Sequence, residues 1–192
     1  MGIEYARKNI FVRSMLIIYA VFYFCITPTA FLATLYIART FGHEVWRLTV
    51  YEIGFSAGAL LGGLIIARWG GFRNGIDTIA FACLGIGITP IIVGFSGFIV
   101  FISAIFVMGI FTSLFSSVEM TLIQKQVEPN MQGRVFGLIQ IVSTLMMPVG
   151  MLLFGPLGDI VEVGWLIIGG GILSVLLGIR VFLNKNLKRL IM

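Results

Sequence analysis

Long apolar runs separated by short polar segments repeat along this chain from its beginning to its end. The run 135–154 carries no charged residue over about 20 positions and would be roughly 30 Å long as a helix, which matches the hydrocarbon thickness of a bilayer. The pattern predicts an all-α polytopic membrane protein, with residues 1–192 forming a single six-helix transmembrane domain. The predicted spans are 14–36, 46–67, 76–94, 98–123, 135–154 and 163–183.

Composition supports a lipid environment. Hydrophobic residues make up 59% and charged residues 11% of the chain, whereas a soluble domain carries about 25% charged residues. The mean hydropathy is +1.08, which means more apolar surface than the core of a water-soluble protein could bury. Cys25 and Cys83 both lie in apolar runs, so we expect small buried side chains and no disulfide, metal site or cofactor.

The net charge of +5 reflects topology, and we expect no nucleic-acid partner. Eleven basic residues fall on one side of the predicted spans and only Arg39 and Arg47 on the other. The eleven are Arg7, Lys8, Arg13, Arg68, Arg73, Lys125, Arg134, Arg180, Lys185, Lys188 and Arg189. This bias predicts an integral protein of a bacterial cytoplasmic membrane with both termini cytoplasmic.

Two breaks in helical structure are expected. Pro129 disfavours helical geometry at Glu128, so the fourth span should end there and the chain should restart at Gly133 and Arg134. The sequence Thr27-Pro28-Thr29 should break the first span near the middle of the membrane.

The fourth span predicts a water-facing surface. Thr112, Ser116 and Glu119 follow the i, i+4, i+7 spacing of one helix face. Further polar residues are expected to widen that face: Ser113, Ser117, Thr121 and Gln124. The alternative is that the hydroxyl groups return hydrogen bonds to their own helix.

Two acids lie inside predicted spans. Glu119 is roughly 9 Å inside Lys125 along the helix axis, and Glu52 is roughly 9 Å inside Trp46 from the other side. A charge deep in a bilayer costs about 2.5–3.5 kcal/mol, so both acids are candidates for proton coupling. For Glu119 the alternative is a structural hydrogen bond or a charge that reaches the surface. For Glu52 it is an ion pair with Arg47 or Arg39.

Spaced glycines predict close helix packing. Gly54, Gly58 and Gly62 recur every four residues and leave one smooth helix face. The second and fifth spans both end in glycine-rich sequence, on opposite faces of the membrane. That placement favours an inverted three-plus-three repeat, although small residues are common in membrane helices generally.

Three segments carry a resemblance to major facilitator transporters. QKQVEPNMQGRVFGL resembles their link between the tenth and eleventh helices, and PVGMLLFGPLGD resembles the eleventh helix of the drug:proton antiporter branch, which includes macrolide-efflux pumps. Gly150, Gly155, Pro156 and Gly158 follow that branch's glycine–proline pattern, with Gly158 one residue early.

The third segment is similar to the family's cytoplasmic loop signature, G-x-x-x-D-R-x-G-R-R. Gly63, Arg68 and Gly70 match it, while Ala67 fills the acidic position and Gly71 and Phe72 replace the basic pair. The resemblance implies a cytoplasmic gate, whose candidate residues are Arg68, Gly70, Arg73, Asp77 and Arg134.

The resemblance covers the chain as the second half of a twelve-helix transporter. It implies efflux of a small amphipathic compound, drug-like or macrolide-like, by proton antiport and alternating access. The partners would be the bilayer, the substrate, protons, and an N-terminal six-helix half or a second copy. The first and fourth spans would line the substrate path, through Thr27, Thr29, Thr112, Ser113, Ser116 and Ser117. The alternatives are a truncated or non-transporting membrane subunit and a homodimer-forming half.

Enzyme-like patterns do not change this interpretation. The sequence 54–58 fits G-x-S-x-G but lies inside an apolar run rather than at a strand-to-helix turn. The sequence 94–97 fits the G-x-S-G of six-helix membrane proteases, which also need a histidine on a later helix. The only histidine is His43, which precedes it, so we expect no enzymatic activity.

Overall fold

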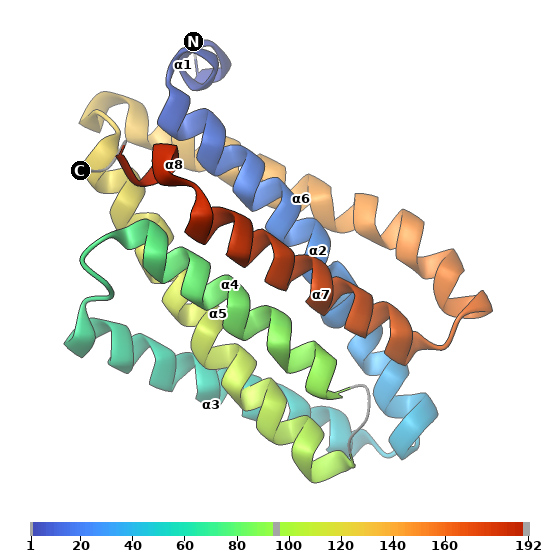
Figure 1. Ribbon diagram of the computed structural model, residues 1–192. Coiled ribbons are helices and arrows are strands. Elements are labelled where there is room, and N and C mark those ends of the chain that lie inside the picture. Colours follow the sequence, from blue (N-terminus) through green and yellow to red (C-terminus); the bar gives the residue numbers. More distant parts are fainter. Residues whose placement is uncertain (1, 94–96, 190–192) are drawn as a thin grey trace.

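The computed structural model describes residues 2–93 and 97–189, and in this part of the chain the secondary structure is entirely helical (Figure 1). Six helices, α2 to α7, are long and apolar enough to cross a membrane, which confirms the predicted all-α fold with six membrane helices. The helices are α1 (Gly2–Lys8), α2 (Ile10–Phe41), α3 (Val45–Trp69), α4 (Gly75–Val93), α5 (Phe98–Gln126), α6 (Pro129–Ile160), α7 (Val163–Leu183) and α8 (Lys185–Arg189). The predicted end of the third span, Gly94, lies outside the described residues.

The link between α5 and α6 is shorter than expected. Helix α5 ends at Gln126 and α6 already begins at Pro129, so the predicted restart at Gly133 and Arg134 is wrong. The proline ring fixes a φ suited to the first helical position, where no N–H donor is needed. The carbonyl group of Glu128 accepts the first two backbone hydrogen bonds of the new helix, at 2.8 and 3.1 Å.

Helix α2 is continuous, so the predicted break at Thr27, Pro28 and Thr29 is also wrong. The hydroxyl group of Thr27 donates to the Tyr23 carbonyl at 2.8 Å. Helix α7 approaches the same turn so closely that a Cβ atom at Gly170 would lie 3.2 Å from the Pro28 ring. A proline is tolerated here because hydroxyl groups and neighbouring helices support the backbone around it.

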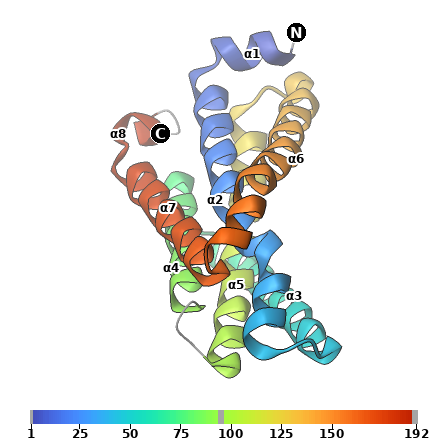
Figure 2. The same cartoon turned by 90° about the vertical axis from the view of Figure 1, so that its right-hand side faces the viewer.

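The helices interlock across two triplets, α2–α4 and α5–α7 (Figures 1 and 2). Helix α2 packs mainly against α6 and α7, α5 packs mainly against α3 and α4, and α4 packs against α7. In a three-plus-three repeat, α2 corresponds to α5, α3 to α6 and α4 to α7. Exchanging the members of each of these pairs leaves the set of packing contacts unchanged. This is the pattern expected of an inverted three-plus-three repeat.

The contact between α4 and α7 joins two helices that correspond to each other in the repeat. It is formed by glycines. A Cβ atom at Gly87 would lie 2.7 Å from the Gly171 carbonyl oxygen, and one at Gly171 would lie 2.6 Å from the Gly87 carbonyl oxygen. Each glycine therefore faces the backbone of the other helix, and neither position has room for a side chain. Such close approach allows dispersion and backbone contacts to hold helices together in lipid, where no hydrophobic force does so.

Candidate functional site

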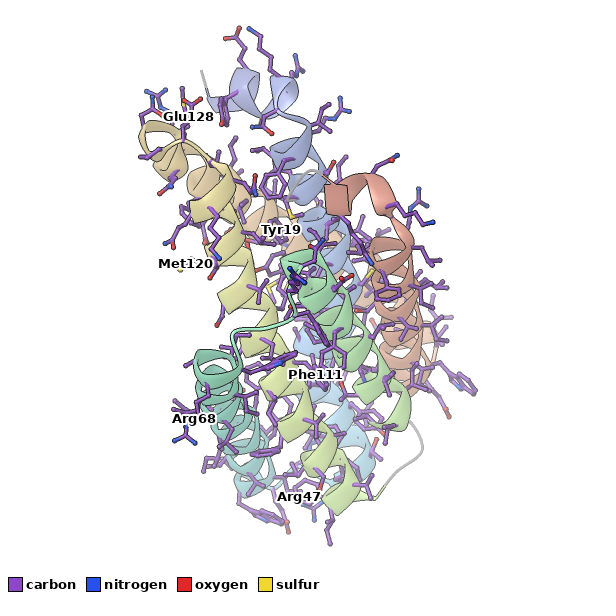
Figure 3. All side chains as sticks on the ribbon, turned by 60° about the vertical axis from the view of Figure 1, so that its left-hand side comes forward. Tyr19, Arg47, Arg68, Phe111, Met120 and Glu128 are labelled. Atoms are coloured by element: carbon purple, nitrogen blue, oxygen red, sulfur yellow. The ribbon has the colours of Figure 1, made fainter. Side chains whose placement is uncertain are left out.

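Helices α2 and α5 meet through aromatic side chains near the middle of the bundle. The rings of Phe22 and Phe115 stack at a centroid distance of 4.1 Å and an angle of 16°, and the Tyr19 ring meets Phe115 edge-on at 5.8 Å. Figure 3 shows Tyr19 inside the bundle. Glu119 lies one helical turn after Phe115, on the same face of α5, so it also points toward α2.

Glu119 is enclosed among apolar and phenolic groups. Its side chain is 9% exposed, and the hydroxyl groups of Tyr19 and Tyr23 lie within electrostatic range of its carboxylate. Glu119 forms no ion pair with another described residue. The buried Tyr19 hydroxyl also lacks a hydrogen-bond partner among the described residues. The result is a carboxyl group, able to take up and release a proton, in surroundings that do not neutralise its charge.

Two of the hydroxyl groups predicted to line the substrate path bond locally. Thr112 donates to the Met108 carbonyl of its own helix at 2.8 Å, while Ser116 is exposed on the same side of α5. On α2, Thr27 is fully buried, and a Cβ atom at Gly150 of α6 would lie 2.7 Å from its side chain. The alternative reading, in which hydroxyl groups return hydrogen bonds to their own helix, therefore describes the geometry of Thr112 and Thr27.

Thr29 behaves differently. Its side chain is 3% exposed, and its hydroxyl group has no hydrogen-bond partner among the described residues. It is thus a buried polar group on α2 whose bonding capacity is unused, which usually reflects a specific functional or structural demand.

The other polar residues of α5 do not share the Glu119 face. Ser113 faces α3, where a Cβ atom at Gly62 would lie 2.9 Å from its side chain. Ser117 and Thr121 line a cavity of about 540 Å³ between α3, α4 and α5, together with Arg73 and Lys125. The expectation of one wide polar face was wrong because steps of 100° per residue spread these positions around the helix.

Glu52 lies exposed on α3. Its proposed ion-pair partners are engaged elsewhere: Arg47 pairs with Glu44 at 3.1 Å, and Arg39 pairs with Asp159 at 3.7 Å and donates to the Gly158 carbonyl at 2.9 Å. The alternative of a Glu52 ion pair with either arginine is therefore wrong for this structure.

The gate candidates do not form one cluster. Arg68 closes α3, and Gly70 caps it with a φ of 74°, a conformation that favours glycine. Arg73 lines the cavity beside α5, and Arg134 donates to the sulfur atom of Met131 at 3.5 Å. Arg68 lies on the outer surface of α3 (Figure 3).

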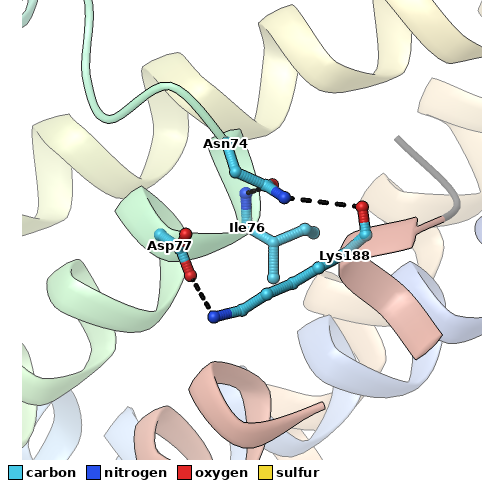
Figure 4. A network of polar contacts seen from close by, with 4 residues as sticks. All are labelled: Asn74, Ile76, Asp77 and Lys188. Carbon is cyan, nitrogen blue, oxygen red and sulfur yellow. Dashed lines mark hydrogen bonds and ion pairs between the residues drawn. The ribbon is translucent and has the colours of Figure 1, made fainter. Parts of the chain in front are cut away.

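Asp77 has a partner that sequence reasoning missed. Its carboxylate forms a 2.5 Å ion pair with Lys188 of α8, rather than with Arg73 or Arg134 (Figure 4). Asn74 accepts from the Ile76 backbone N–H at 3.0 Å and donates to the Lys188 carbonyl at 3.4 Å. No local spacing signals a contact between residues 111 positions apart, so only the fold reveals it.

The glycines of α3 differ in how closely they pack. A Cβ atom at Gly58 or Gly62 would overlap backbone atoms of α5, whereas one at Gly54 would make an ordinary 3.4 Å contact. In α6, Gly150 lies against α2, but a Cβ atom at Gly155 would have nothing within 4 Å. Pro156 is exposed, and α6 continues through it to Ile160.

A polar group on α6 was also missed. Gln140 donates to Thr144 at 3.4 Å, and Ser143 donates to the Gln140 carbonyl at 3.0 Å. The i, i+3, i+4 spacing of these three residues was available in the sequence, in the middle of a span otherwise read only for its glycines and prolines.

Comparison with known proteins agrees with this architecture. The family model of the Major Facilitator Superfamily matches residues 9–189. Macrolide efflux protein A of Streptococcus pyogenes is 28% identical over 173 residues, which are 88% of this chain and 43% of that protein. Macrolide efflux protein A of Enterococcus faecalis is 29% identical over 153 residues, 78% of this chain and 47% of that protein.

A third relative is the uncharacterized MFS-type transporter YvqJ of Bacillus subtilis, 28% identical over 179 residues, 91% of this chain and 42% of that protein. The chain thus spans less than half the length of these relatives. Six apolar helices in an interlocked repeat, and a family match from residue 9 to residue 189, confirm the resemblance seen in the sequence. The chain is an integral membrane protein that belongs to the Major Facilitator Superfamily of transporters.

Proposed function

We propose that this chain forms one six-helix half of a twelve-helix transporter that exports a small amphipathic compound, macrolide-like in character, in exchange for protons. Family membership supports a transporter rather than an enzyme. The macrolide efflux relatives support the substrate class and the direction of transport.

The enclosed carboxyl group of Glu119 is the observation that carries the proton-coupling part. It lies between α2 and α5 with aromatic rings on one side and the exposed Ser116 on the same helix face. In a conformation that admits water, the carboxyl group can ionise; in one that seals it among the rings, the neutral form is less costly. Opposite conformations would then bind a proton with different affinities, which is the requirement for coupling protons to alternating access.

A second bundle is proposed because two helices bury little of their surface within this one. Both α3 and α6 expose most of their side chains, including large apolar residues along their length. The exposed apolar residues of α6 include Ile141, Leu145, Val149, Leu152 and Leu153. An N-terminal half or a second copy would cover part of this surface and complete the substrate path. We therefore expect a monomer of this chain alone not to move substrate.

Accumulation of a radiolabelled macrolide tests the proposal. The chain would be expressed in a macrolide-sensitive bacterium lacking its own efflux pumps, alone and together with the N-terminal half of a macrolide efflux protein A. We expect cells that express both halves to accumulate less macrolide than cells that express this chain alone. A protonophore should remove that difference. Transport by the chain as a demonstrated monomer would contradict the half-transporter assignment, whereas transport by a dimer of the chain would identify a second copy as the partner.

The Glu119→Gln variant tests the carrier of the proton. It keeps the shape of the side chain and removes its titration, so proton-driven efflux should be lost while expression is retained. Glu128→Gln is the matched control, because Glu128 is exposed in the link between α5 and α6 at one end of the molecule (Figure 3). Proton-dependent efflux that survives in Glu119→Gln would show that another group carries the coupling.

A further inference from the structure

A groove lies between α2 and α7. It is near the end of the bundle that carries α1 and α8, whose position Figure 1 shows. Its volume is about 470 Å³. Most of the surface that lines it is apolar, and Leu187 of α8 lies at one end. Its α2 residues are Ser14, Ile17, Ile18 and Val21, and its α7 residues are Leu173, Leu176, Leu177, Arg180 and Val181.

Polarity changes along the length of this groove. Ser14, Arg180 and Asn184 lie near the helix ends, whereas Val21 and Leu173 lie further along the spans. The distance from position 184 to position 173 corresponds to roughly 16 Å of helix, about half the thickness of the hydrocarbon core. The groove therefore has the length of one leaflet, with its polar end at the membrane surface.

The polar end is basic and lacks a countercharge. The side chain of Arg180 is exposed and forms no hydrogen bond or ion pair with another described residue. The same holds for the side chains of Arg13 and Lys185, which adjoin Ser14 and Asn184 in sequence. No aspartate or glutamate lines the groove. Arg180 thus brings a positive charge to the polar end of the groove, and Arg13 and Lys185 adjoin two of its lining residues in sequence, so an anionic group would be attracted there.

The wall at this end is fixed by polar contacts. Asn184 accepts from the Leu187 backbone N–H at 3.2 Å, and Leu187 is only 3% exposed. The next residue, Lys188, joins α8 to the start of α4 through Asp77 and Asn74 (Figure 4). The groove is therefore closed at its polar end by a helix tied to the bundle rather than by a loose terminus.

We propose that this groove binds one anionic phospholipid of the leaflet on the side of the termini. Its acyl chain would lie along Ile17, Val21 and Leu173, and its phosphate group would accept hydrogen bonds from the guanidinium of Arg180. A groove with this apolar lining would be filled by acyl chains where it opens to the bilayer. The basic, acid-free rim selects an anionic headgroup over a zwitterionic one. This inference does not depend on the transported substrate.

Native mass spectrometry of the full chain, released from detergent micelles, tests the proposal. The protein would be titrated with phosphatidylglycerol and phosphatidylcholine carrying identical acyl chains. One phosphatidylglycerol should be retained preferentially, and Arg180→Gln should lower that preference about fivefold, the factor that one basic residue contributes at an anionic surface. Arg180→Lys, which keeps the charge, should retain most of it. Leu176→Trp, which fills the apolar part of the groove, should reduce retention of both lipids.

The control is Arg68→Gln, which removes an exposed positive charge from the same side of the membrane but from α3, away from the groove. An equal loss of preference in Arg68→Gln and Arg180→Gln would overturn the proposal, because it would show non-specific attraction. Competition by excess glycerol phosphate without acyl chains would overturn the acyl-chain part. A dimer peak lost in Leu176→Trp without a change in lipid retention would assign the groove to a second copy of the chain. Circular dichroism of each variant would establish that it is folded.

Discussion

The reciprocal glycine contact between α4 and α7 predicts the effect of a single methyl group. A Cβ atom at Gly171 would lie 2.6 Å from the Gly87 carbonyl oxygen and 3.2 Å from side-chain atoms of Pro90 and Ile91. Non-bonded heavy atoms prefer separations of about 3.5 Å or more, so Gly171→Ala should push the two helices apart by about 1 Å.

The size of the effect follows from the dispersion contacts that such a shift weakens. A gap of this size removes about a quarter to a half of the energy of each contact. For an interface of about 40 atom contacts worth about 0.15 kcal/mol each, losing a third amounts to about 2 kcal/mol. We therefore expect Gly171→Ala to destabilise the bundle by about 2 kcal/mol, within the range observed when packed cores are overfilled.

Unfolding in mixed micelles of dodecyl maltoside and sodium dodecyl sulfate, followed by circular dichroism, measures this difference. Gly169→Ala is the matched control: it lies two residues away in α7, and its added methyl group would meet no atom within 4 Å. Alanine is the better helix former, so the control should leave stability unchanged or raise it by up to about 1 kcal/mol. Equal unfolding midpoints for the two variants would refute the close approach of α4 and α7.

Three further outcomes are expected. Asp77→Asn should lower stability by about 1 kcal/mol. In a protein that already carries Lys188→Met, Asp77→Asn should have little further effect, because either change alone removes the same ion pair. Additive effects of the two changes would contradict that pairing. A cysteine placed at Lys185 should resist a membrane-impermeant maleimide in intact cells and react after permeabilisation, since the basic bias predicts cytoplasmic termini; labelling in intact cells would reverse the topology. Glu52→Gln should reduce proton-driven efflux less than Glu119→Gln, because Glu52 is exposed; a larger loss would move the coupling role to α3.

The number and identity of the membrane helices were predictable because lipid imposes a length and a composition on each one. Interruptions were harder to predict. Pro28 was expected to break α2, but the helix continues through it. The hydroxyl group of the adjacent Thr27 bonds the Tyr23 carbonyl one turn earlier, and the glycine face of α7, a distant helix, packs against the proline ring. A proline inside a span therefore does not by itself indicate a broken helix.

The candidate site was predictable only where helical spacing alone determines position. Glu119 was predicted from its depth in the span, and it is buried in the structure, while its coupling role stays a prediction. Ser113 and Ser117 were assigned to the wrong side because the sequence does not show which face each neighbouring helix covers. The partner of Asp77 required knowledge of the position of α8, which depends on the packing of the whole bundle.

The interlocked pairing of the two triplets has a consequence for how the protein is made. Helices α2, α3 and α4 contact one another little, and their main partners all belong to α5–α7. A ribosome delivers these first three helices to the membrane before any of those partners exists. The glycine faces of α3 and α4 must therefore remain in lipid until α5 and α7 arrive, so assembly of the bundle depends on late insertion events rather than proceeding helix by helix.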